Sequence, residues 1–80
     1  MKANKVINFV LKRMQKDYEY DGYLALAAAI LTSAVDDYKV ALIDNDERAQ
    51  KDCERFFLSG YGQLLSLGHG EYIIDHTRKI

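Results

Sequence analysis

The stretch from Tyr23 to Ile43 limits most strongly what this chain can fold into. Neither proline nor glycine occurs between residues 23 and 59, so nothing there interrupts a helical hydrogen-bond ladder. Alanine and leucine, which favour helices, are plentiful in it. The apolar residues that recur on one face of a helix, over about five turns, are Leu24, Ala27, Ala28, Leu31, Ala34, Val35, Tyr38 and Leu42. We therefore expect a central alanine-rich helix at about 23–43, with Ile30 and Ile43 broadening its buried face.

Two shorter segments flank this helix and carry apolar residues at helical spacing. Residues 3–18 show an amphipathic pattern, and residues 46–58 show a narrow apolar stripe. We expect the stretch Glu19-Tyr20-Asp21-Gly22 to separate the first helix from the central one, since Gly22 tolerates conformations that a helix does not use. Either Asn45 or Asp46 can cap the helix that follows the central one. The apolar positions are Ile7, Val10, Leu11, Met14 and Tyr18 in the first segment, and Ala49, Cys53, Phe56 and Phe57 in the second.

The C-terminal part of the chain divides at a turn, Gly68-His69-Gly70. Before this turn, Ser59 can cap a short helix that contains the leucines at 64, 65 and 67. After it, residues 71–80 leave a helix or a strand open, because Tyr72-Ile73-Ile74 also suits a strand. Eighty residues are enough for one domain. We expect residues 1–80 to form a single all-α domain, a small bundle of four to five helices packed around the central one.

Charge is distributed unevenly along the chain. Residues 1–16 carry five basic residues and no acidic ones, whereas the rest carries the other six basic residues and all twelve acidic residues. On a helix, the basic residues of this segment fall within or beside one sector of about 80°, with Phe9 among them. These residues are Lys2, Lys5, Lys12, Arg13 and Lys16.

Two interpretations of this basic face stay open. It is either an ordinary solvated face, with Phe9 packed under a neighbouring element, or a contact surface for nucleic acid or an acidic protein. The formal net charge of the chain is −1, so it lacks the overall positive charge of a typical DNA-binding domain. Nucleic acid is therefore the less favoured partner.

The groups that could carry chemistry do not have the spacing that chemistry needs. Asp36 and Asp37 are adjacent, and adjacent helical side chains diverge by about 100°, so they cannot flank one substrate atom. The spacing of His69, Glu71, Asp75 and His76 matches no recognised zinc motif. The chain also has no glycine-rich phosphate loop and no nucleophile elbow. We expect no enzymatic activity, no cofactor and no metal.

Cys53 is the single cysteine, so no disulfide can form within the chain and a reducing compartment fits. The most apolar stretch, residues 23–35, is thirteen residues long, whereas a helix needs about 20 to cross a bilayer. The N-terminal residues do not have the pattern of a signal peptide. These features favour a cytoplasmic protein with no membrane partner.

Aromatic residues indicate where a partner could bind. Phe56 and Phe57 are neighbours on one expected helix and point in different directions, so one can fill the core while the other lies in an interface. The six tyrosines add to this expectation, since tyrosine is frequent in interfaces where its ring is buried and its hydroxyl meets water. The candidate interaction surface is Lys5, Phe9, Lys12, Arg13, Lys16, Phe57 and Tyr61.

From Ala27 onward the chain carries short motifs in a fixed order. They read A-V-x-D-Y at 34–38, acid-x-F-F-x-S-x-aromatic at 54–61, a Leu-Leu pair at 64–65 and G-E-Y-I-I at 70–74. Over about two-thirds of the chain, this order resembles a family of small proteins from prophages, phages and integrative elements of Gram-positive bacteria. Tyr61 replaces the family's usual tryptophan, and Gly62 replaces what is often an aromatic residue. The resemblance implies that the chain belongs to a mobile element, and it does not indicate any particular biochemical activity.

These observations lead to one main hypothesis, a non-enzymatic interaction protein of a phage or mobile element. It would bind a protein of the host or the element, for example as an inhibitor of a defence system such as a CRISPR nuclease. One alternative is a nucleic-acid-binding regulator that uses the basic face of the first helix. The other is a structural homo-oligomer.

Overall fold

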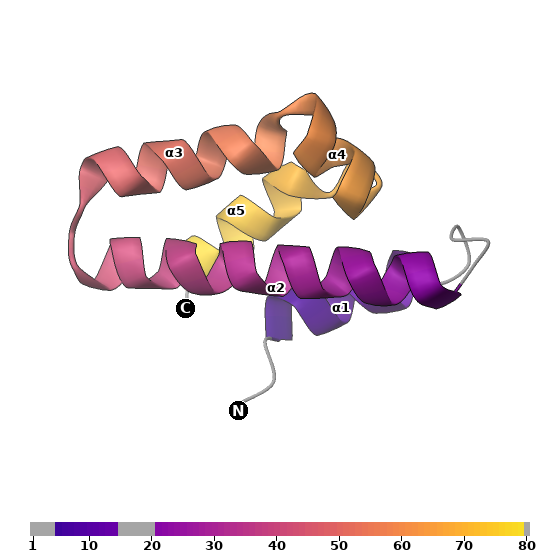
Figure 1. Ribbon diagram of the computed structural model, residues 1–80. Coiled ribbons are helices and arrows are strands. Elements are labelled where there is room, and N and C mark those ends of the chain that lie inside the picture. The colour runs from indigo at the N-terminus through magenta and orange to yellow at the C-terminus, as the bar shows by residue number, and fades with distance from the viewer. Residues whose placement is uncertain (1–4, 15–20, 80) are drawn as a thin grey trace.

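Five α-helices and no strand make up the residues that the computed structural model describes, which are 5–14 and 21–79 (Figure 1). The helices are α1 (Lys5–Met14), α2 (Asp21–Ile43), α3 (Glu47–Leu58), α4 (Gly60–Ser66) and α5 (Gly70–Arg78). Helix α2 contacts each of the other four. The expected all-α bundle around a central helix is therefore confirmed. The sequence left a helix or a strand open for the C-terminal segment, and α5 shows that the helix is right.

The buried face of α2 follows the predicted periodicity, with Leu31, Val35 and Tyr38 entirely buried. Two details of the prediction are wrong. Ile43 is 81 % exposed, because at about 100° per residue it lies far around the helix from Leu31. Asp21 and Gly22 do not belong to a break but form the first turn of α2, where the space that a side chain of residue 22 would occupy is open. Glu19 and Tyr20, the other two residues of the predicted break, lie outside the described residues. The expected limits of the first helix, residues 3 and 18, lie outside the described residues.

Helices α2 and α3 form an antiparallel hairpin, which Figure 1 shows as the two long ribbons. Asn45 turns the chain by adopting the left-handed conformation, with φ of 58°. Asp46 then caps α3, since its carboxylate accepts a hydrogen bond from the Ala49 amide at 3.1 Å. Of the two predicted caps, Asp46 is therefore the one that is used.

Ser59 makes the corner between α3 and α4. Its hydroxyl donates to the Phe56 carbonyl at 2.6 Å and accepts from the Gly62 amide at 3.0 Å, so it ends one helix and caps the next, as predicted. Gly62 is buried where α4 meets α3, and a β-carbon there would lie 2.0 Å from the Phe56 carbonyl oxygen. Only glycine permits this close approach of the two backbones.

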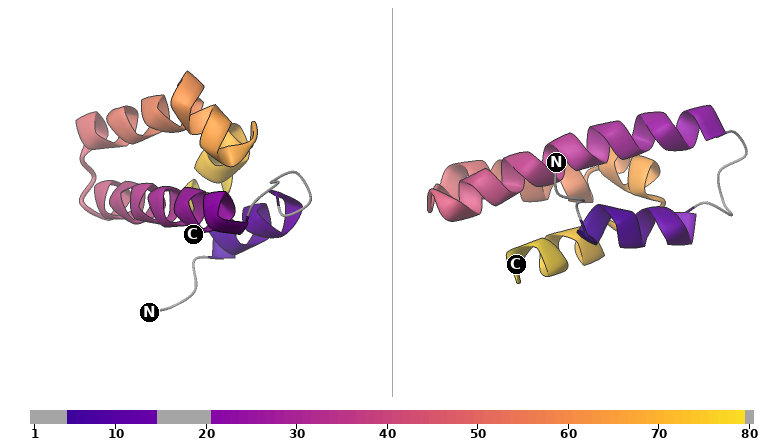
Figure 2. Two further views of the ribbon diagram at one scale, coloured as in Figure 1. Left: turned by 45° about the vertical axis from the view of Figure 1, so that its right-hand side comes forward. Right: turned by 90° about the horizontal axis from the view of Figure 1, so that it is seen from below.

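The helices form two layers. Helices α2 and α3 lie in one, and α1 and α5 lie side by side in the other (Figure 2). Phe57 of α3, Ile73 of α5 and Val10 of α1 are fully buried between them. One side of the α2–α3 hairpin is thus covered by α1 and α5, and the opposite side is free of helices in both views.

Candidate functional site

An open groove runs between α2 and α3 and has a volume of about 550 Å³. Five of its lining residues come from α2 and three from α3. We call it the α2–α3 groove, and its lining residues are Ala29, Ile30, Ser33, Ala34, Asp37, Asp52, Cys53 and Phe56.

Small side chains produce this groove. Ala29, Ser33 and Ala34 follow one another along the same side of α2, and Cys53 faces them from α3. Alanine, serine and cysteine side chains are short, so they leave space unfilled on the surface along the line between α2 and α3. The sequence therefore leaves a hollow where larger side chains would have closed the surface.

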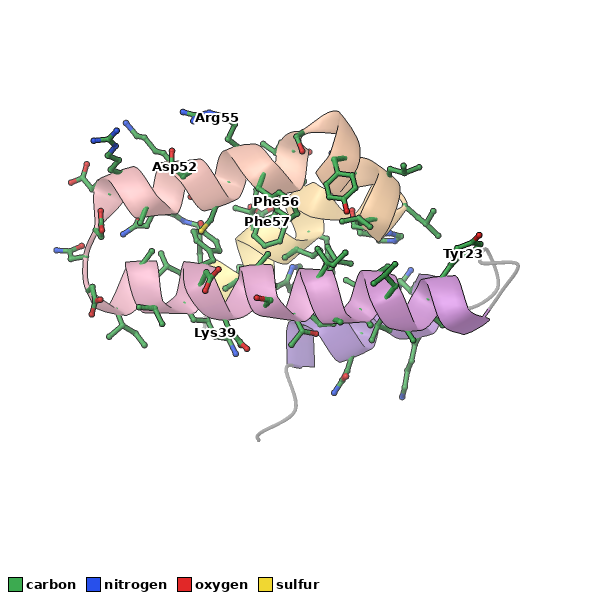
Figure 3. The ribbon with its side chains drawn as sticks, viewed as in Figure 1. Tyr23, Lys39, Asp52, Arg55, Phe56 and Phe57 are labelled. Atoms are coloured by element: carbon green, nitrogen blue, oxygen red, sulfur yellow. The ribbon has the colours of Figure 1, made fainter. Side chains whose placement is uncertain are left out.

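Phe56 and Phe57 leave α3 on the side that faces α2 and divide between the core and the groove (Figure 3). Phe57 is entirely buried, with its ring edge-to-face against Tyr38, the centroids 6.1 Å apart. Phe56 is half-buried and lines the groove. Phe57 is thus the ring that fills the core, and whether Phe56 lies in an interface stays a prediction. Phe57 stands among the predicted interaction residues, but it has no exposed surface with which to contact a partner.

The groove is acidic at one end. Because α2 and α3 are antiparallel, Asp37 lies opposite Asp52 and Cys53, whereas Ile30 and Phe56 lie toward the other end. The pKa of the Cys53 thiol is raised, first by its burial and then by the negative charges of Asp37, Asp52 and Glu54. Asp52 is also paired with Arg55 at 3.2 Å, but both side chains are largely exposed, so solvent screens this pair.

At its apolar end the groove continues onto α4. The Phe56 ring packs edge-to-face against Tyr61, with centroids 6.2 Å apart. Tyr61 is 56 % exposed, and Leu64, three residues further along the same helix, is 68 % exposed. Leu26 of α2 lies on the same side as Ile30 and is also exposed. Together these side chains extend the groove into a larger apolar surface.

The basic face of α1 lies in the other layer. Lys12, Arg13 and Phe9 are exposed there, as predicted. Phe9 is nevertheless engaged: its ring stacks on Tyr72 of α5 with centroids 5.1 Å apart, and the Arg13 guanidinium lies 4.7 Å from its centroid. The interpretation in which Phe9 packs against a neighbouring element is therefore the one the structure supports, although 42 % of the residue stays exposed.

The predicted interaction surface thus divides in two. Phe9, Lys12 and Arg13 lie on α1, which packs on α2 and α5, and Tyr61 lies on α4 beside the groove. Lys16 lies outside the described residues, and of Lys5 only the backbone at the start of α1 is described. The fold does not gather these candidates into one surface.

A polar cluster joins three helices at the other end of the core. Tyr38 donates to Glu54 Oε2 at 2.5 Å, and Arg78 donates to the Tyr38 hydroxyl at 3.0 Å and to Glu54 at 2.7 Å. Burial, more than any other cause, raises the pKa of Tyr38 to about 12, and its hydrogen bond to Glu54 adds to this. Because each group is satisfied by the other two, the cluster holds the helices together and offers no reactive group.

Each of the two C-terminal histidines also has a ring nitrogen within hydrogen-bond distance of a nearby backbone carbonyl oxygen. Nδ1 of His69 lies 2.8 Å from the Ser66 carbonyl oxygen, and Nδ1 of His76 lies 2.9 Å from the Tyr72 carbonyl oxygen. Within residues 5–14 and 21–79, no three metal-binding side chains converge on one point. In the same part of the chain, none of the helices combines the length and the apolar character that spanning a bilayer would require.

Reasoning from the sequence missed the groove itself. The signal for it in the sequence is the run of small residues on α2, which is also typical of close packing between helices. The structure shows that α3 approaches only one side of these residues, which leaves Ala29 and Ser33 exposed. Comparison of this chain with protein-family models, with curated proteins and with solved structures gives no significant match.

Proposed function

We propose that this chain is a non-enzymatic protein-interaction module, which binds a partner protein through the α2–α3 groove and the apolar surface beside it. The observation that carries the proposal is an open groove of about 550 Å³ that continues into the exposed side chains Tyr61 and Leu64. Contiguous apolar surface of this kind on a small protein is typical of binding sites.

The physical support is the free energy that burial of this surface would release. Apolar surface removed from water contributes about 25 cal/mol per Å², so covering several exposed side chains drives association. Tyr61 and Phe56 add aromatic rings, which are frequent among the residues that dominate binding energies. No reactive group is needed for a protein that acts by occupying a partner's surface.

The resemblance to small phage and integrative-element proteins supports a setting for this binding. In a cytoplasm invaded by a mobile element, such a module would serve by inhibiting a host protein, and a nuclease of a defence system is the example we propose. The basic face of α1 gives less support to nucleic-acid binding, because the Phe9 ring is already stacked on Tyr72 and covered by Arg13.

Affinity capture with matched variants tests the proposal. The tagged chain is expressed in a Gram-positive host, and the captured proteins are compared between wild type and the double variant Tyr61→Ser, Leu64→Ser. We expect one protein to be lost with this variant and retained with Val40→Ser, since Val40 is also 56 % exposed but lies outside the groove and its extension.

The purified partner is then titrated by calorimetry, which must show direct binding with the same dependence on the variants. Capture of nucleic acid alone, with salt-sensitive binding lost in Lys12→Glu, would support the regulator alternative and contradict the proposal. Sedimentation of the chain as a stable oligomer that buries the groove would instead support the structural alternative.

A further inference from the structure

The α2–α3 hairpin has two sides, and only one of them carries a helix in the described structure. On the covered side α5 contacts both α2 and α3 and closes the core with Ile73. On the open side lies the α2–α3 groove, whose small residues give it the shape of a shallow trough between two helices. A helix laid along this trough would pack on the hairpin as α5 does on the opposite side.

The charges of the groove select among such helices. Asp37 from α2 and Asp52 from α3 line one end, so an occupant meets two carboxylates there. The other end is apolar, lined by Ile30 and Phe56. An occupant that matches both ends has apolar side chains along its length and a basic residue where it passes the two aspartates.

We propose that the groove binds an amphipathic helix of the partner protein, with lysine or arginine at the end that lies over Asp37 and Asp52. This inference rests on the proposed function and names the chemistry of the partner. The partner's apolar anchors recur at i, i+3 or i+4, and i+7, which is the pattern of helix-in-groove recognition. The small floor residues Ala29 and Ser33 leave room for anchors as large as leucine.

The groove and its extension also set the length of the bound helix. From Leu26 to Asp37, α2 rises by about 17 Å at 1.5 Å per residue, so a helix of about three turns covers the surface.

The test uses a library of helical peptides of about sixteen residues, which is long enough for three turns and a cap at each end. The library is displayed on yeast and selected against the whole purified chain. We expect enriched peptides to combine apolar residues at helical spacing with lysine or arginine near one end. Binding of a selected peptide is then measured by fluorescence anisotropy against variants of the chain.

Two pairs of variants locate the peptide. Ala29→Leu fills the groove and should weaken binding at least about tenfold, whereas Asn8→Leu, which adds a leucine to an exposed position of α1 in the other layer, should leave it unchanged. Asp37→Lys should weaken binding to a similar extent, whereas Asp44→Lys, an exposed aspartate beyond the end of α2, should not. Circular dichroism establishes that each variant is folded.

Each outcome decides the inference. Enrichment of acidic peptides, equal binding by basic and acidic versions of one peptide, or no enrichment would overturn it. So would a dimer in sedimentation that Ala29→Leu dissociates, since this result would place a second copy of the chain in the groove. The proposed function is tested separately, by the capture experiment with the variant Tyr61→Ser, Leu64→Ser. It stands if a partner protein binds at the groove through a segment other than a helix with a basic end.

Discussion

Tyr38 donates its phenolic hydrogen to Oε2 of Glu54 over 2.5 Å, although the two residues lie on different helices and 16 positions apart. Arg78, 40 positions beyond Tyr38, donates to the same hydroxyl and to the same carboxylate oxygen. One residue from each of α2, α3 and α5 thus meets at a single point. This cluster fixes the position of α5 against the hairpin, and with it the side of the hairpin that stays open.

Replacing Tyr38 by phenylalanine should destabilise the fold. The Tyr38→Phe variant keeps the buried ring but loses the hydroxyl that joins Glu54 to Arg78, and the loss of a hydrogen bond to a charged group costs about 2 kcal/mol. Urea unfolding followed by circular dichroism measures the change. Tyr61→Phe is the control, since Tyr61 is 56 % exposed and its substitution should change stability by less than about 0.5 kcal/mol. Equal stability of both variants would contradict the structural role of the cluster.

Stability should fall at alkaline pH because of the same tyrosine. The pKa of Tyr38 is raised from 10.0 to about 12 in the folded chain, chiefly by burial. Between these two values the unfolded chain loses the proton and the folded chain keeps it, so ionisation favours unfolding. The contribution is fully present below pH 10 and is lost as the pH rises toward 12. Urea unfolding at pH 9 to about 11.5 should show a steeper decline for wild type than for Tyr38→Phe, and parallel curves would refute the assignment.

Gly62 should tolerate no side chain. The Gly62→Ala variant would place a β-carbon 2.0 Å from the Phe56 carbonyl oxygen, which forces α4 away from α3. We expect a loss of about 3 kcal/mol in the free energy of unfolding, the upper range for overpacking. Gly60→Ala is a matched control, because nothing lies within 4 Å of the added carbon, and it should be neutral or stabilising by up to about 1 kcal/mol. Thermal unfolding of the two variants gives the comparison.

Cys53 should react slowly with alkylating reagents. Burial and the charges of Asp37, Asp52 and Glu54 raise the pKa of its thiol, so less thiolate is present at neutral pH than for an ordinary cysteine. The pH dependence of iodoacetamide modification, followed by mass spectrometry, should have its midpoint above that of a free cysteine. Asp37→Asn should lower this midpoint and Asp75→Asn, on the exposed side of α5, should not. A midpoint equal to that of free cysteine would show that neither burial nor the neighbouring carboxylates raise the pKa of the Cys53 thiol.

Much of the fold could be predicted from local patterns in the sequence. The apolar period of α2, the Asp46 cap and the Ser59 corner each depend on residues within a few positions of one another. The candidate site could be predicted only in part: Tyr61 is exposed as expected, but Phe57 is buried and the basic residues of α1 lie elsewhere. Two adjacent phenylalanines have the same local signal, and only the packing of distant helices distinguishes Phe56 from Phe57.

The amino-acid sequence alone indicates that this chain is helical, where its long central helix lies, that Ser59 caps α4 and that Asn45 or Asp46 caps α3. These features follow from short-range hydrogen bonding and from the spacing of apolar residues, which the order of residues specifies directly. The tertiary structure alone decided which side of the α2–α3 hairpin is covered. That choice depends on contacts between residues as far apart as Tyr38 and Arg78, which bring α5 to one side and leave the α2–α3 groove open on the other.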